Sequence, residues 1–108
     1  MKTCSALLLA ISAVTLCAGA AADPLPAERQ AALAYLVRQD CGSCHGMTLK
    51  GGLGRPLLPE TLEGAEAEAL AEIILDGIPG TPMPPWRGQL SEAEALWIAR
   101  GLKRGTIE

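Results

Sequence analysis

The sequence predicts an all-α domain of three to four helices joined by long loops. Three observations support this class. Apolar residues recur every three or four positions in several stretches, as they do on one face of a helix. Helix-boundary signals flank these stretches, and the clearest is the capping box Ser91-Glu92-Ala93-Glu94. We find no alternating strand pattern and no internal repeat, and a chain of 108 residues has the length of one domain.

The N-terminal residues 1–22 are predicted to be a cleavable signal peptide. Lys2 gives a positive start, the run Leu7 to Ala13 is apolar, and Ala20-Ala21-Ala22 fits a cleavage site. The apolar run is shorter than the roughly 20 residues of a membrane span. One alternative is an uncleaved membrane anchor. Another is a lipoprotein signal, which Cys17 suggests. We expect cleavage after Ala22, no membrane span in the mature protein, and export to the periplasm as residues 23–108.

Four helical segments are expected in the mature chain. The first covers residues 27–40, which are rich in good helix formers and follow a proline suited to a first helical position. A short turn is expected at Pro59–Glu63, and a helix from about Ala65 to Asp76, ended by Gly77. The last helix should run from Glu92 to about Arg104, after the capping box.

Two long loops connect these helices. Residues 46–59 contain four glycines and two prolines, which break any regular period. Residues 78–90 contain four prolines, which fix φ and remove backbone donors. We therefore expect an irregular first loop and a stiff, extended second loop.

The pentapeptide Cys41-Gly42-Ser43-Cys44-His45 follows the first predicted helix. Two cysteines three positions apart, followed at once by a histidine, are the pattern of a c-type haem attachment site. The thiols bind the two vinyl groups of the haem, and His45 then becomes an axial ligand of the iron. The alternatives are a thioredoxin-like redox pair and half of a zinc site. A haem would also supply the apolar centre that a small domain with no Phe otherwise lacks.

Met83 is the candidate for the second axial ligand. The mature chain has no second histidine, and Met47 and Met83 are its methionines. Met47 lies two residues beyond His45 and is tethered to the same side of the haem. Met83 lies 38 residues beyond His45, in the proline-rich loop, where it has enough chain to reach the opposite face. We predict Met83 as the ligand and a packing or surface role for Met47.

With these motifs, the chain resembles the class I monohaem cytochromes c over residues 27–104. The resemblance rests on Cys41-Gly-Ser-Cys44-His45, Gly54-Arg-Pro56-Leu57, Met83-Pro-Pro-Trp86 and the helix start Leu90-Ser-Glu-Ala-Glu94. Within the class, three segments are most similar to the periplasmic cytochromes c encoded beside the haem-cd nitrite reductase of denitrifying bacteria. These segments are Gln39 to Gly46, Gly51 to Gly54 and Gly80 to Trp86.

The resemblance implies a class I cytochrome c fold, in which the N- and C-terminal helices cross beside one covalently bound haem. Class members commonly have a glycine on the first helix that faces an aromatic residue on the last. This chain has Leu33 and Gly101 at those positions, so we expect Leu33 to pack over Gly101. Trp97 and Tyr35 would then form the aromatic part of the interface.

The resemblance also implies residues that support the haem and its ligands. Pro56 matches the proline whose carbonyl accepts a hydrogen bond from the axial histidine, although Arg55 before it alters the local pattern. Arg55 and the Trp86 Nε1–H are candidates for contacts with a haem propionate. Ordinary surface and packing roles are the alternatives for both.

The expected function is electron transfer and not catalysis, because an iron with both axial positions filled has no open place for substrate. A net charge of −3 and the lack of a basic stripe argue against a nucleic-acid partner. The resemblance implies redox partners, in particular haem-cd nitrite reductase, to which a monomer would donate electrons. A redox accessory role in maturation of the nitrite reductase haem is the main alternative. A thiol oxidoreductase that uses Cys41 and Cys44 is a third.

Overall fold

The computed structural model describes residues 25–107, and the predicted signal peptide lies outside this range. The described residues form helices and loops without strands, as predicted. In chain order the elements are α1 (Ala27–Leu36), the π-helical segment η1 (Val37–Cys41), α2 (Gly42–His45), α3 (Pro59–Leu62), α4 (Ala67–Asp76) and α5 (Glu92–Arg104). Within residues 25–107, no helix combines the length and apolarity needed to cross a membrane.

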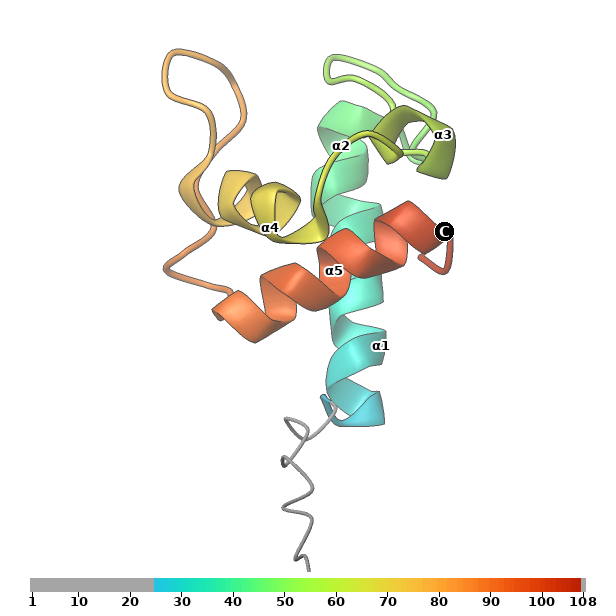
Figure 1. Ribbon diagram of the computed structural model, residues 1–108, viewed down its shortest axis with the longest axis vertical. Helices are drawn as coiled ribbons and strands as arrows, with labels where there is room; N and C mark the ends of the chain where they lie inside the picture. Colours follow the sequence, from blue (N-terminus) through green and yellow to red (C-terminus); the bar gives the residue numbers. More distant parts are fainter. Residues whose placement is uncertain (1–24, 108) are drawn as a thin grey trace, which may run out of the picture.

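The first three elements form one continuous helical rod, which α5 crosses at mid-length (Figure 1). The sequence predicts the end of this helix at residue 40, whereas the structure continues it through the cysteine–histidine motif to His45. The π-helical turn is closed by a bond from the Gly42 N–H to the Val37 carbonyl. The rod ends at Gly46, whose φ of 90° favours glycine. The motif is therefore the last turn of a rigid helix.

The helices on the other side of the molecule have ends close to those predicted. Helix α5 has the predicted bounds, and its capping box is formed, since the Ser91 hydroxyl accepts from the Glu94 N–H and the Glu94 carboxylate from the Ser91 N–H. Helix α4 begins two residues later than predicted and ends before Gly77, which has the expected positive φ of 65°. Figure 1 shows α4 beside the N-terminal half of α5 and α3 near its C-terminal end.

The core lies where α1, η1 and α4 pack against α5. Its fully buried large side chains are Leu33, Leu75, Ile98 and Val37. The prediction that Tyr35 belongs to the aromatic interface is wrong, because 62% of its surface is exposed. Tyr35 points away from the core, while the half-buried Trp97 packs against it.

Ile107, and not the predicted Leu33, is the side chain nearest to Gly101. A Cβ atom on Gly101 would lie 2.6 Å from Cδ1 and 2.8 Å from Cγ1 of Ile107. The chain reverses at Gly105, which has a φ of 67°, and the Thr106 N–H donates to the Gly101 carbonyl. This reversal folds Ile107 back over the glycine, and Leu33 is buried in the core.

Polar contacts fix α5 at both of its ends. The Arg29 guanidinium of α1 pairs with Glu94 at 2.5 Å, near the start of α5. Near its end, the Lys103 ammonium donates to carbonyls at and just beyond the end of α3, those of Leu62, Glu63 and Ala65. Helix α5 thereby joins the rod, α3 and α4 into one frame that holds the two loops.

Candidate haem site

Cys41 and Cys44 lie one turn apart on the rod, half-buried and present as free thiols. Burial, followed by the charge of Asp40, raises the pKa of the Cys41 thiol to about 11. Redox-active C-x-x-C pairs have the opposite property, since they need a thiol with a lowered pKa. In residues 25–107, no three His, Cys, Asp or Glu side chains are grouped so that they could hold a metal ion. The raised pKa of Cys41 therefore argues against thiol exchange by this pair.

His45 ends the rod, and its ring is oriented by the loop of residues 46–58, called the glycine loop below. The Nδ1 atom lies 2.6 Å from the carbonyl oxygen of Arg55. A carbonyl can only accept, so Nδ1 carries the proton, and in the neutral ring Nε2 keeps the lone pair that an iron ligand needs. The Pro56 carbonyl was predicted as this acceptor, and the structure corrects it to the carbonyl one residue earlier.

Pro56 acts on this bond through the conformation of its neighbour. A residue before proline is restricted to extended backbone, so Pro56 limits the direction of the Arg55 carbonyl. The pyrrolidine ring also packs on Gly51, where a Cβ would lie 3.2 Å from the Pro56 Cγ atom. The proline therefore supports His45 without a hydrogen bond to it, and the carbonyl of Arg55 is the acceptor.

The glycine loop folds back onto the end of the rod. The Gly51 N–H donates to the His45 carbonyl at 2.8 Å, and the Gly54 N–H donates to the Cys44 carbonyl at 2.7 Å. A Cβ on Gly54 would lie 2.8 Å from both Cε1 and Nδ1 of His45. Residue 54 must therefore be glycine for the ring to keep this position. This role of Gly54 was not expected from the sequence, in which the pattern Gly54-Arg55-Pro56 was the available signal.

Met83 lies in a closed loop at the end of α4. Its carbonyl accepts from the Ile78 N–H at 3.2 Å, and its N–H donates to the Thr81 hydroxyl at 3.3 Å. A Cβ on Gly77 would lie 2.6 Å from the Met83 carbonyl oxygen, so the outgoing and returning segments of the loop approach closely at its base. Trp86 then returns the chain to α4, where its N–H donates to the Leu75 carbonyl at 2.9 Å.

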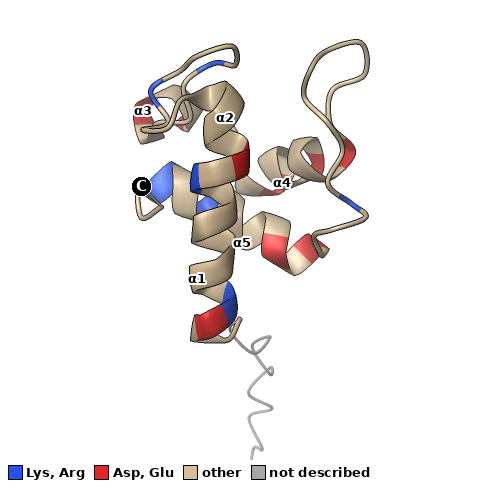
Figure 2. Cartoon of the chain, turned by 180° about the vertical axis from the view of Figure 1, so that it is seen from behind, with Lys and Arg blue, Asp and Glu red and all other residues tan. Residues whose placement is uncertain are grey.

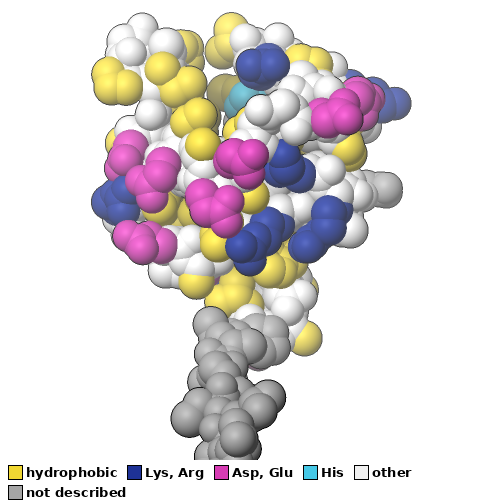
Figure 3. Space-filling model, in the orientation of Figure 1, with side chains coloured by type: hydrophobic (Ala, Val, Ile, Leu, Met, Phe, Trp, Pro, Cys, Tyr) yellow, Lys and Arg dark blue, Asp and Glu magenta, His cyan; other side chains and the backbone are white. Residues whose placement is uncertain are grey.

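The two loops stand on either side of a hollow that opens at one end of the molecule. Figure 1 shows the Met83 loop apart from α2 and the glycine loop, and Figure 3 shows the surface recessed between them, with a histidine side chain at the recess. Helix α4 carries the half-buried apolar side chains Leu70 and Ile74, and the loop adds Trp86. A thiol pair, an oriented imidazole and half-buried apolar groups fit an apolar haem.

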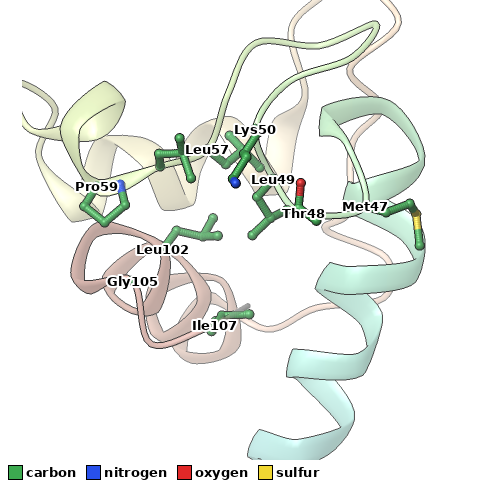
Figure 4. Close-up of a pocket in the computed structure, with 10 residues that line it drawn as sticks. Met47, Thr48, Leu49, Lys50, Leu57, Pro59, Leu102, Gly105 and Ile107 are labelled. Atoms are coloured by element: carbon green, nitrogen blue, oxygen red, sulfur yellow. The ribbon is translucent and has the colours of Figure 1, made fainter.

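A second hollow, of about 530 Å³, lies behind the glycine loop (Figure 4). It is lined by residues of that loop, of the following segment and of the C-terminal turn, among them Leu49, Leu57, Leu102 and Ile107. Met47 borders it and is 58% exposed. Neither the thiols, His45 nor Met83 line this hollow. The Met47 sulfur lies beside Gly42 of α2, where a Cβ would be 3.4 Å away, and its packing or surface role stays a prediction.

The other predicted residues have known positions but no described contact that assigns them a role. The Arg55 side chain is exposed, and only its carbonyl is tied to His45. Trp86 is half-buried against the core. Their contacts with a haem propionate stay predictions.

Comparisons with known proteins agree with this arrangement. A protein-family model described as subunit III of cbb3-type cytochrome c oxidase matches residues 28–100. Cytochrome c55X of Paracoccus denitrificans is 54% identical over 100 residues, which cover 93% of this chain and 97% of that protein. Cytochrome c55X of Pseudomonas aeruginosa is 49% identical over 104 residues, or 94% and 87% of the two chains.

The solved structure of the c-type cytochrome NirC superposes with a TM-score of 0.74 at 52% identity, covering 76% of this chain and 96% of that one. The dihydro-haem d1 dehydrogenase NirN, solved in complex with DHE, gives a TM-score of 0.59 at 40% identity, but only 15% of it is covered. A short part of that larger protein is thus similar to this chain. The predicted class I fold and the single covalently bound c-type haem are confirmed. The chain belongs to the cytochrome c family, in the group that contains cytochrome c55X.

Proposed function

We propose that this chain is a periplasmic electron carrier whose haem iron is ligated by His45 and Met83, and that it donates electrons to haem-cd nitrite reductase. The bond from His45 Nδ1 to the Arg55 carbonyl carries the proposal, because it directs the Nε2 lone pair toward a ligand. The proline-rich Met83 loop stands on the other side of the recess from the glycine loop, which supports Met83 as the second ligand. Two ligands from the protein leave the iron no open position for a substrate.

Each residue of the site has a separate task in this proposal. Cys41 and Cys44 hold the haem by thioether bonds, and His45 binds the iron from the end of a rigid helix. Met83 supplies a thioether, and histidine–methionine ligation favours a high reduction potential. The haem, when bound, takes up and releases one electron. Rigid ligands on both sides keep its geometry nearly the same in both oxidation states.

The loops beside the recess suit a brief encounter with a partner protein. Segment 77–86 carries no charged residue. Leu53 is 79% exposed on the glycine loop and Ile78 is 46% exposed on the other. Redox encounters use small, transient interfaces, so these exposed apolar groups are sufficient for a contact beside the haem. We propose that the carrier works as a monomer.

The partner is inferred from relatives and from the resemblance to cytochromes encoded with nitrite reductase. Similarity to NirC supports an electron donor in that system. A second candidate role is redox support during maturation of the nitrite reductase haem. It is favoured by the 45% identity, over 60 residues, to a protein named dihydro-haem d1 dehydrogenase. That match covers only 12% of the dehydrogenase.

Ligation is tested on the mature protein recovered from the periplasm. A denaturing gel stained for haem should show a stained band, and the oxidised protein should show the methionine–iron charge-transfer band. Met83→Ala should abolish this band, and Met47→Ala is the matched control that should keep it. A colourless wild-type protein would contradict haem attachment, and a band that survives in Met83→Ala would contradict Met83 as the ligand.

The partner is tested by mixing the reduced protein with nitrite reductase that either contains or lacks its haem d. Rapid oxidation only by the complete enzyme supports the donor role. Equal oxidation by both forms, or by neither, contradicts it and favours the maturation role. Arg55→Gln and Trp86→Phe, compared by reduction potential, test the two proposed propionate contacts, since either loss should shift the potential.

A further inference from the structure

The loop that carries Met83 is fastened to the end of α4 at both of its ends. On the outgoing side, the Gly77 N–H donates to the Ile73 carbonyl at 2.9 Å. On the returning side, the Trp86 and Arg87 N–H groups both donate to the Leu75 carbonyl at 2.9 Å. The position of Met83 therefore depends on how firmly the returning segment, residues 84–87, is bound to α4.

Arg87 adds a side-chain attachment at this point. Its Nε donates to Asp76 Oδ1 at 2.8 Å, and its Nη2 donates to Glu72 Oε2 at 3.0 Å. Its Nη1 lies 3.6 Å from Glu92 Oε1, at the start of α5. One guanidinium thus joins the loop to two carboxylates on α4 and one on α5. The planar fork of arginine suits such multiple contacts, whereas lysine is a single point charge.

The charges around Arg87 make this attachment specific. Figure 2 shows the Met83 loop without charged residues until it returns to α4 and α5. Hydrogen bonding to Arg87 lowers the pKa of the Asp76 carboxyl, and Asp76 in turn raises the pKa of Arg87. Without Arg87, three carboxylates would face one another at the base of the loop. Loss of the guanidinium would therefore remove its attraction to these carboxylates and leave only the repulsion among them.

We propose that Arg87 is a positioning residue for the Met83 ligand, an inference that rests on the proposed ligation by Met83. It keeps the loop closed and so holds the thioether on the iron. The bonds described above join segment 77–87 to α4 and α5, whereas His45 is held by the glycine loop. Loss of Arg87 should consequently weaken the methionine side of the site and leave the histidine side unchanged.

Arg100 offers a matched control for this proposal. It also joins α5 to α4, through a pair with Glu68 at 3.2 Å, and its side chain is 52% exposed, against 47% for Arg87. It does not adjoin the Met83 loop. Arg87→Ala and Arg100→Ala therefore remove the same charge and a similar pair, and only the first releases the loop.

The test measures imidazole binding to the ferric haem protein, because exogenous imidazole binds only when Met83 leaves the iron. Arg87→Ala should bind imidazole about three- to tenfold more tightly than wild type. Each exposed ion pair contributes little stability, but Arg87 makes three of them, and the substitution removes all three. Arg100→Ala should stay within about twofold of wild type, and Arg87→Lys should lie between wild type and Arg87→Ala. Amide hydrogen exchange should accelerate at residues 86 and 87 in Arg87→Ala, and not at Gly51 or Gly54.

Two outcomes separate the failure of this inference from that of the proposed function. Equal imidazole affinities and equal exchange in Arg87→Ala and Arg100→Ala would overturn the positioning role while Met83 remains the ligand. A wild-type protein that binds imidazole as tightly as Met83→Ala would instead overturn the ligation itself. Faster exchange at residue 86 would still report the attachment of the loop in that case.

Discussion

The Nδ1 atom of His45 lies 2.6 Å from the carbonyl oxygen of Arg55, and this contact joins the end of the haem-motif helix to the glycine loop. In the proposed ligation it directs the imidazole toward the iron, because the proton on Nδ1 leaves Nε2 with its lone pair. The bond also increases electron density in the ring. An electron-rich ligand stabilises ferric iron more than ferrous iron, so the contact should influence the reduction potential.

Pro56→Ala should raise the reduction potential. Alanine removes the restriction on Arg55, its carbonyl turns more freely, and the bond to His45 weakens. A hydrogen bond worth about 0.5–1.5 kcal/mol corresponds to about 20–60 mV for one electron, which bounds the shift. The control repeats the substitution in an Arg55→Ala background, which keeps the carbonyl but removes the arginine charge. Redox titration should give the same shift from Pro56→Ala in both backgrounds, and a shift that vanishes without the Arg55 side chain would show that the arginine charge, and not the carbonyl, is its cause.

Gly54→Ala should displace the histidine ring. The new Cβ would lie 2.8 Å from two ring atoms of His45, closer than side chains approach one another, so ring or loop must shift. We expect a loss of about 1–3 kcal/mol in unfolding free energy and a disturbed haem spectrum. Gly64→Ala is the control, since its Cβ meets nothing within 4 Å. Thermal unfolding followed by absorbance distinguishes them, and equal midpoints would contradict the predicted clash.

The local patterns in the sequence were enough to predict most of the fold. The capping box at Ser91 and the glycine at residue 77 mark helix ends through their own backbone chemistry, and both appear in the structure. The pentapeptide ending in His45 predicts its ligand chemistry because the spacing of thiols along a helix is fixed. Such features depend on neighbours within a few residues.

The remaining errors concern contacts that the chain makes by folding back on itself. The carbonyl that meets His45 comes from ten residues away, and which of two adjacent carbonyls points at the ring depends on the dihedrals of the whole loop. Ile107 reaches Gly101 only because Gly105 reverses the chain. The π-helical turn at Val37–Cys41 was likewise not expected, because no capping or spacing signal in the sequence marks it.

Gly77→Ala should loosen Met83 from the iron. Alanine is strained at a φ of 65°, and its Cβ would lie 2.6 Å from the Met83 carbonyl oxygen. The base of the loop must then open, and the methionine–iron band should weaken or disappear at a lower temperature. Gly88→Ala, whose Cβ meets nothing within 4 Å, should leave the band unchanged. An intact band in both variants would show that the loop base does not set the position of Met83.

Protonation of Glu94 should destabilise the crossing of α1 and α5 in acid. The bond from Arg29, with help from the Ser91 N–H, lowers the pKa of Glu94 below its usual 4.5. A lowered folded-state pKa means that its stabilisation is complete above about pH 4.5 and is lost as the pH falls through the folded value. Glu94→Gln should lose about 1–2 kcal/mol at pH 7 and approach wild type once the pH falls below the folded-state pKa of Glu94. Denaturant curves with the same difference at both pH values would refute this.

Ile107 and Gly101 should behave as a coupled pair. Gly101→Ala places a Cβ 2.6 Å from Ile107 Cδ1, so in wild type the C-terminal turn must shift or detach. In an Ile107→Ala background that space is vacant, and the same substitution should cost less, because alanine also has a higher helix propensity than glycine by about 1 kcal/mol. A double-mutant cycle in denaturant should give a coupling of about 1 kcal/mol or more between these positions.

Leu33→Ala is the control for this cycle. It will lower stability but should leave the cost of Gly101→Ala unchanged, since Ile107 and not Leu33 covers the glycine. Coupling of Gly101 to Leu33 alone would restore the originally expected packing of the crossed helices.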